Sequence, residues 1–441
     1  MDLLNFDSLA TSMIIFISFL FIGVGGFASK YLKGDILYRT FFFRLALLFI
    51  SLVLMVSSNN LMLLLLSLFT SNIIFTLMMI HKPSWKAAKA SGLLAAKNFI
   101  LGFLFLSLAF LLIYIETKEL NIQTILSLTL ESKTVMVALV FIIIAAMTQS
   151  GIWPFHLWLT SSLNSPTPVS ALMHAGLVNG GGFLLLRFSN LYLNYPGLLN
   201  TIFIIGMFSA IVGTLWKLIQ NDIKRMLAFS TLGQMGFMLV QFGLGLFSTA
   251  FAHIILHGMF KSYLFLNSGS AAKEKKVLLT FSPTLTNLML GLVFGVFGAI
   301  TYNLITHKQE PLINSSFLIT AIVYLFTAQL AIIILQKINL KNIIVAFGVC
   351  LTSACCYGFS HKIITMSFTS DRIISQPLNF LHIWAIAFLI IGWLFVLYFT
   401  PKNQYGTNAP NWFKQFYVKA LNSSQPHPTT ITTHHNDYKY V

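Results

Sequence analysis

The sequence predicts an all-α polytopic membrane protein with about 13 transmembrane helices and with broken helices at its centre. The composition and the number and length of the apolar runs predict this class. Of the residues, 57% are hydrophobic and only 9% are charged, whereas soluble domains have about 25% charged residues. A third observation predicts the broken centre, because one apolar stretch also contains prolines, histidines and a run of glycines. The apolar runs are too many and too long for a soluble core.

The apolar runs divide the chain into spans that are joined by short loops. With about 20 apolar residues as the template for one span, the predicted spans are 9–29, 41–57, 60–80, 93–115, 134–153, 166–187, 197–216, 226–245, 247–268, 284–304, 316–336, 341–360 and 380–399. We expect four regions: N-terminal transmembrane helices over 1–92, a central core over 93–283, C-terminal transmembrane helices over 284–400 and a polar tail over 401–441.

The stretch over residues 153–187 is the one that we expect to be broken. Its helix-interrupting residues are Pro166, Pro168, Gly180, Gly181 and Gly182. Non-helical backbone at membrane depth persists only where protein buries it or where it lines water. The glycines permit either close helix contact or local unwinding. The stretch is therefore predicted to be an interior element at the centre of a transport path.

The charged residues predict the orientation in the membrane. Lys and Arg gather in the loops after odd-numbered spans, except after the fifth, and the other loops are neutral, acidic or only slightly basic. By the positive-inside rule, the amino terminus lies outside and the carboxyl terminus in the cytoplasm of a cell (inner) membrane. The net charge of +16 comes from these scattered loop residues. No basic stripe on a soluble domain indicates a nucleic-acid partner.

The sequence indicates no metal or cofactor site in this chain. Cys350, Cys355 and Cys356 share one apolar segment and lack metal-ligand spacing, so we interpret them as packing residues. His434 and His435 in the polar tail could bind a metal, but they fit better an end that is poorly ordered or docked on a partner.

One predicted span carries three ionisable residues on one helical face. His253, His257 and Lys261 are four residues apart, which places them one above another. All 11 Asp and Glu residues lie in loops or at span ends, so a proton path would depend on His, Lys, hydroxyls, amides and water. The alternatives are a polar stripe that holds helices together or a lysine that extends toward the membrane surface.

Further polar residues are predicted at membrane depth beside this stripe. His174 follows the proline break and shares its span with Asn179. Thr148, Gln149 and Ser150 end the preceding span. These side chains would either hold water chains or form hydrogen bonds between helices, and the sequence leaves both possibilities open.

Three sequence motifs carry a family resemblance. They read M-T-Q-S-G-I-W-P-F-H-L-W-L with S-P-T-P-V-S-A-L-M-H-A-G, then N-D-I-K-R-M-L-A-F-S-T-L-G-Q-M-G, and H-I-I-L-H-G-M-F-K-S-Y. The chain resembles the proton-conducting, antiporter-like membrane subunits, a family that includes NuoL of respiratory complex I and the large Mrp antiporter subunits. The resemblance covers roughly residues 6–270 and implies an antiporter-like fold with a conducting core over 93–283. By this resemblance, the first two helices of the family have no counterpart in this sequence.

Two positions depart from the family pattern. The family carries a Glu where this chain has Phe69, and a Lys where it has Gln149. The charged switch of the family is therefore replaced, whereas His174, His253, His257 and Lys261 remain.

Within the family, the sequence of the first motif is most similar to the DabB and MpsA branch, the membrane subunits of the DAB inorganic carbon transporter. This resemblance implies a non-enzymatic subunit that conducts cations, chiefly protons, and energises CO2 and bicarbonate uptake by a DabA-like soluble zinc protein at the cytoplasmic face. The zinc and a carbonic-anhydrase-like site belong to that partner, and the lipid bilayer surrounds this chain. The alternatives are a subunit of a respiratory or Mrp-type antiporter, or a non-conducting membrane scaffold.

Overall fold

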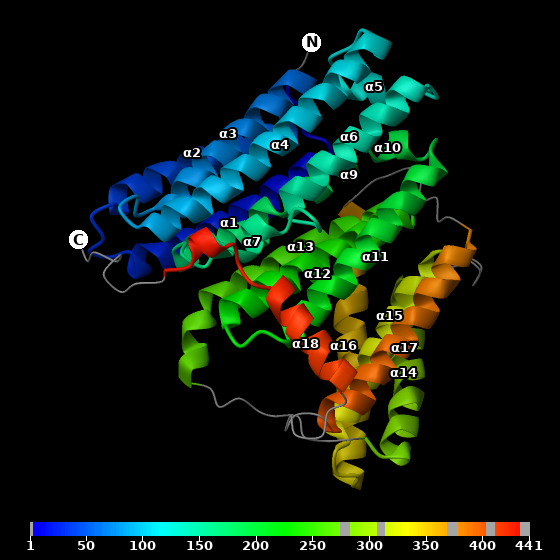
Figure 1. Ribbon diagram of the computed structural model, residues 1–441. Coiled ribbons are helices and arrows are strands. Elements are labelled where there is room, and N and C mark those ends of the chain that lie inside the picture. The colour runs from blue at the N-terminus through cyan, green and yellow to red at the C-terminus, as the bar shows by residue number, and fades with distance from the viewer. Residues whose placement is uncertain (1–2, 274–282, 307–313, 368–376, 403–410, 433–441) are drawn as a thin grey trace.

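A computed structural model describes residues 3–273, 283–306, 314–367, 377–402 and 411–432 (Figure 1). Within those ranges the regular elements are helices, and pairing between extended residues is limited to isolated bridges. The prediction of an all-α protein is confirmed.

The first four long helices form one side of the molecule, coloured blue to cyan in Figure 1. They are α1 (Ser8–Tyr31), α2 (Tyr38–Ser57), α3 (Leu61–Ile80) and α4 (Lys86–Thr117). Asp7 caps α1 by accepting a hydrogen bond from the Ala10 N–H at 2.8 Å, and Asn60 caps α3 through the Met62 N–H at 2.9 Å. Such side chains supply the acceptors that the first turn of a helix lacks.

The central part of the chain alternates long helices with short ones. Its elements are α5 (Ile122–Ser127), α6 (Lys133–Ser150), α7 (Leu157–Thr160), α8 (Thr167–Leu172), the π-helical turn η1 (Met173–Leu177), α9 (Asn179–Arg187), α10 (Ser189–Tyr192), α11 (Pro196–Leu218), α12 (Ile223–Gly243), α13 (Phe247–Leu266) and η2 (Ser268–Lys273). The largest cluster of buried apolar side chains joins this part to α1–α4.

The last helices form a block beside α11 and α12 (Figure 1). They are α14 (Leu285–Thr306), α15 (Ser316–Ile334), α16 (Leu340–Ser367) and α17 (Phe380–Lys402), followed by α18 (Asn411–Ser423) and η3 (Pro428–Thr430). Cys350 in α16 is buried, but Cys356 is exposed, so the interpretation of the three cysteines as packing residues is wrong for Cys356.

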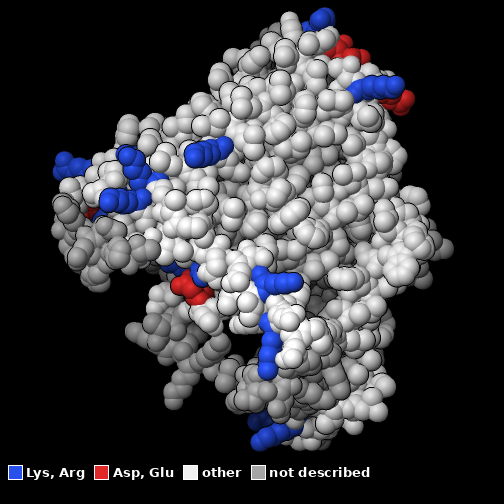
Figure 2. Space-filling view, in the orientation of Figure 1, with Lys and Arg blue, Asp and Glu red and all other residues white. Residues whose placement is uncertain are grey.

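Eleven helices of the described residues are long and apolar enough to cross a membrane. Two further predicted spans correspond to α13, which carries the His and Lys stripe, and to α17, whose apolar part is shorter. Figure 2 shows a wide band with few charged side chains between a corner where acidic and basic side chains gather and the mostly basic residues toward the opposite edge. The protein is therefore a multi-pass membrane protein.

The span over Thr167–Arg187 is the most enclosed of the eleven. Its apolar window is 94% buried, against 33% for Lys86–Thr117. The chain before it is broken, because α6 ends at Gly151 with a φ of +63° and the next long helical segment begins only at Thr167. Pro166 and Pro168 start α8 rather than interrupt it, as expected where the first helical N–H groups have no partner.

The glycine run is helical, so its predicted unwinding is wrong and the alternative of close contact is right. A Cβ atom on Gly181 would lie 2.3 Å from the backbone oxygen of Ala146, and one on Gly182 would lie 2.3 Å from the sulfur of Met238. The irregular turn comes earlier, in η1, where His174 lies. The glycines therefore bring α9 against α6 and α12.

The polar tail docks on its own chain over residues 424–432. The His427 N–H donates to Ser161 Oγ at 2.9 Å, and Asn164 Nδ2 donates to the Thr430 carbonyl at 2.8 Å. Ser161 and Asn164 belong to the break between α7 and α8. The prediction of a poorly ordered or partner-bound tail is thus wrong for this part, and His434 and His435 lie outside the described residues.

Candidate functional site

Lys261 is a fully buried lysine on α13. Its exposed fraction is 0%, and its Nζ donates to the backbone carbonyl of Leu227 in α12 at 3.0 Å. The ion pairs within the described residues do not include Lys261. A buried ammonium without a counter-ion is costly, so a lysine at this position is not an ordinary packing residue.

Thr231 connects the Leu227 carbonyl to the broken helix. Its hydroxyl donates to that same carbonyl at 3.1 Å, and it lies 3.1 Å from His174 Nδ1. Since a hydroxyl has one proton and donates it to Leu227, it accepts the proton of His174 Nδ1 in this arrangement. Lys261 and His174 therefore share one continuous polar connection through the backbone of α12.

His174 is held in the π-helical turn. Its ring stacks on Phe265 of α13 with centroids 4.2 Å apart and an interplanar angle of 7°, and the residue is 1% exposed. Turns of this type are rare and frequently occur at functional sites. The turn and the stacked ring fix the imidazole in place against Thr231.

His253 and His257 continue the stripe on α13. Their rings stack at 5.9 Å with an interplanar angle of 13°, which confirms that they lie on one face. The two ring nitrogens of His257 and Nε2 of His253 have no hydrogen-bond partner in the described part of the chain. Buried polar atoms normally have a partner, so these nitrogens have hydrogen-bonding capacity that the described residues do not use.

The two positions that the sequence resemblance assigns to the family's charged residues do not meet. Phe69 is partly buried on α3 and packs on Phe103 at 4.4 Å. Gln149 instead pairs with Asn72, one turn further along α3. Asn72 Nδ2 donates to Gln149 Oε1 at 3.0 Å, and Gln149 Nε2 donates to Asn72 Oδ1 at 3.1 Å. A neutral amide pair therefore connects α3 to α6.

The other predicted site residues form hydrogen bonds to backbone. Ser150 donates to the Val178 carbonyl at 2.7 Å, and Asn179 Nδ2 donates to the Ala175 and Ile254 carbonyls at 2.7 and 3.3 Å. Thr148 donates within its own helix, to Ala145 at 2.7 Å. Ser150 and Asn179 thus hold helices together, although Asn179 Oδ1 is buried without a partner in the described residues.

Two cavities lie next to the broken stretch. One of about 20 Å³ is lined by Gln149, Gly180 and apolar side chains, which is room for about one water molecule. The other, of about 500 Å³, is lined by the break at Asn164 and by Asp35 and His81. His81 Nε2 lies 3.2 Å from Asp35 Oδ2. This larger cavity reaches the break from the end of the molecule where the basic loops lie.

Asp35 is the titratable acid of that larger cavity. Burial raises the pKa of Asp35, but the Leu37 N–H, His81 and Lys82 together outweigh burial and hold the pKa below its ordinary value. The carboxylate therefore stays ionised at neutral pH.

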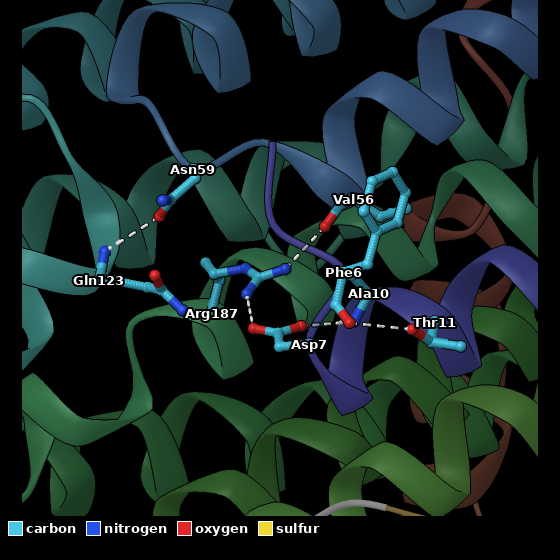
Figure 3. A network of polar contacts seen from close by, with 8 residues as sticks. All are labelled: Phe6, Asp7, Ala10, Thr11, Val56, Asn59, Gln123 and Arg187. Atoms are coloured by element: carbon cyan, nitrogen blue, oxygen red, sulfur yellow. Dashed lines mark hydrogen bonds and ion pairs between the residues drawn. The ribbon is translucent and has the colours of Figure 1, made fainter. Parts of the chain in front are cut away.

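An ion pair fixes the other end of the broken stretch (Figure 3). Arg187, at the end of α9, donates through one guanidinium nitrogen to Asp7 and through the other to the Val56 carbonyl, the latter at 2.6 Å. Arg187 is 6% exposed. The contact attaches α9 to the start of α1 and the end of α2.

Sequence reasoning did not find Asn72, Thr231 or Arg187. A signal for Asn72 was present, since a lone amide in a span of leucines and isoleucines needs a partner. No signal distinguished Thr231 from the many other hydroxyls, because its importance depends on which carbonyl Lys261 reaches.

Comparisons with known proteins identify the family to which this chain is similar. The sequence model of the NADH:quinone oxidoreductase/Mrp antiporter transmembrane family matches residues 58–289. Two relatives from Halothiobacillus neapolitanus are named probable inorganic carbon transporter subunits. One, DabB1, is 36% identical over 61% of this chain and 50% of its own length. The other, DabB2, is 32% identical over 86% of this chain and 71% of its own length.

A further relative and one solved structure extend the comparison. A probable DabB subunit from Bacillus subtilis is 35% identical over 62% of this chain and 55% of its own length. The structure of an Mrp complex from Dietzia sp. DQ12-45-1b matches with a TM-score of 0.56 and 21% identity, over 95% of this chain and 48% of that chain. The chain thus spans about half the length of several proteins that it matches, and the structural likeness establishes an antiporter-like fold.

Proposed function

Because this chain belongs to the NADH:quinone oxidoreductase/Mrp antiporter family of membrane subunits and is related to its DabB members, we propose that it conducts protons across a cell (inner) membrane. The path follows Lys261, His257, His253 and His174. The amino terminus lies outside and the basic loops lie in the cytoplasm, where the larger cavity beside Asn164 connects the break to water.

One observation carries this proposal: Lys261 is fully buried and connects to His174 through the Leu227 carbonyl and Thr231. A lysine that only held helices together would need no second titratable group at the end of its hydrogen bonds. An ionisable residue inside a membrane domain is by default a functional one. The unpaired nitrogens of His257 and His253 extend the same row of titratable groups.

The proton flow energises inorganic carbon uptake. The DabB relatives are named inorganic carbon transporter subunits, and the neutral Asn72–Gln149 pair argues against an antiporter that depends on the family's charged switch. A DabA-like soluble zinc protein docks at the cytoplasmic face and hydrates CO2 to bicarbonate, so this chain is not itself an enzyme. One charge that moves inward across 100 mV releases about 2.3 kcal/mol, which can drive that reaction in one direction.

The test compares Lys261→Ala and His257→Ala with wild type in sealed proteoliposomes under an imposed membrane potential. A pH-sensitive dye inside the vesicles measures proton influx. We expect both variants to lose the influx, because each removes a titratable group from a row without acids. Lys337→Ala, at an exposed lysine between α15 and α16, is the matched control and should conduct like wild type. Wild-type influx in both path variants would refute the proposal.

A second measurement tests the link to carbon uptake. Cells that need added CO2 are supplied with this chain and a DabA-like partner, with and without an uncoupler. Growth in air that the uncoupler abolishes supports the coupling. Growth that is insensitive to the uncoupler would support a non-conducting scaffold instead.

A further inference from the structure

Helix α18 has no buried residue. Its sequence is N-W-F-K-Q-F-Y-V-K-A-L-N-S. One broad side of the helix carries its aromatic residues, at spacings of one, three and four: Trp412, Phe413, Phe416 and Tyr417. The exposed fractions of Trp412, Phe416 and Tyr417 are 54%, 51% and 40%. Aromatic side chains concentrated on one side, with polar residues opposite, indicate that this side contacts an apolar phase.

The C-terminal end of α18 is held at the ends of two membrane spans. Its start follows the end of α17 at Lys402 after the eight residues 403–410. At its other end, the Ser424 carbonyl accepts from an Arg225 guanidinium nitrogen at 2.9 Å, and Ser424 Oγ accepts from Gln220 Nε2 at 2.9 Å. Gln220 and Arg225 flank the turn between the spans α11 and α12.

The length and direction of the helix fit a position along the membrane surface and not a crossing of the membrane. With 13 residues it is about 20 Å long, too short for a span. Figure 1 shows it crossing the direction of α14 and α17 instead of continuing α17. A short amphipathic helix attached next to the ends of two spans is placed to lie in the plane of the interface.

The charges of α18 and its neighbours specify the lipid. Lys414 and Lys419 are exposed, and α18 contains no Asp or Glu. Lys217 and Lys224 lie in the adjoining turn region. Basic residues beside an apolar face attract anionic headgroups, and Trp and Tyr prefer the headgroup level. A second copy of this basic helix would repel the first, so the charge disfavours self-association.

We propose that α18 is an in-plane membrane helix. Its aromatic side docks on anionic phospholipids, on the side of the membrane where the basic loops of the protein lie. The docked helix also holds residues 424–432 on the break, because these residues follow α18 directly and bind Ser161 and Asn164.

The test uses the full-length protein in vesicles whose lipids carry brominated acyl chains, which quench nearby Trp fluorescence. The difference between the fluorescence of the wild type and that of Trp412→Phe isolates the signal of Trp412. In vesicles that contain phosphatidylglycerol, we expect quenching of that signal. Lys414→Gln/Lys419→Gln should weaken the quenching about twofold or more, because it removes the attraction to anionic headgroups. In vesicles of phosphatidylcholine alone, the quenching of Trp412 in the wild type should also be weaker.

The matched control is Lys337→Gln/Lys341→Gln, which should leave the quenching unchanged. Lys337 lies in the loop after α15, and Lys341 lies in the first turn of α16. Circular dichroism checks that every variant is folded. Trp412 that is quenched by aqueous iodide and not by brominated lipid would overturn the proposal in favour of a solvated helix. Protection from both quenchers would overturn it in favour of a protein that covers this side.

Discussion

The hydroxyl of Thr231, together with the Leu227 carbonyl, connects His174 to Lys261 in the proposed path. Thr231→Val keeps the shape of the side chain but removes the bonds to Leu227 and His174, which are both 3.1 Å long. His174 Nδ1 then loses its partner in a buried site, which costs about 1–3 kcal/mol. If the hydroxyl stabilises the proton-loaded form of His174 by this amount, its loss adds the same free energy to the barrier, and the influx falls about 5- to 160-fold.

The assay is the proteoliposome influx under an imposed potential, together with the unfolding midpoint in detergent. Thr231→Ser restores the hydroxyl and should restore most of the influx. The matched control is Thr327→Val in α15, a residue that is 0% exposed and whose hydroxyl contacts only backbone carbonyls. It should lower the midpoint and leave the influx unchanged. A folded Thr231→Val protein that conducts within about twofold of wild type would mean that protons bypass Thr231.

Three other substitutions test the packing and charges around the path. Gly181→Ala should lower the unfolding free energy by about 1–3 kcal/mol, because the new methyl group has no room; thermal unfolding measures this. Asn72→Leu should cost about 1–3 kcal/mol, since Gln149 loses its amide partner, and thermal unfolding measures this too. Asp35→Asn should lower the midpoint at pH 7 by weakening the contact with His81. Because the folded-state pKa of Asp35 is depressed, its contribution exists above the unfolded-state pKa and disappears as the pH falls through the folded-state value.

Each of the three has its own control. Gly26→Ala in α1, where a Cβ atom meets nothing within 4 Å, should be neutral or stabilising, and an equal loss there would contradict the packing argument. The double variant Asn72→Leu/Gln149→Leu should recover part of the loss, because no amide is then left unpaired; no recovery would argue against the pair. For Asp35→Asn, a difference in midpoint that stays constant down to about pH 3 would contradict the linkage to its ionisation.

The sequence by itself determined the membrane class, most helix positions and the row of ionisable residues on α13. Apolar runs of membrane length have one stable solution, because a helix satisfies its own backbone in lipid. Helical periodicity placed His253 and His257 on one face, and their stacked rings at 5.9 Å agree.

Only the tertiary structure decided which groups from separate helices meet. The sequence could not pair Gln149 with Asn72, which lies 77 residues away, or connect Lys261 to His174 through a backbone carbonyl and Thr231. It also could not decide whether the glycines unwind or pack, since both outcomes use the missing side chain. These contacts depend on how helices approach one another, and the close fit of Gly181 against Ala146 is fixed only when α9 and α6 are packed together.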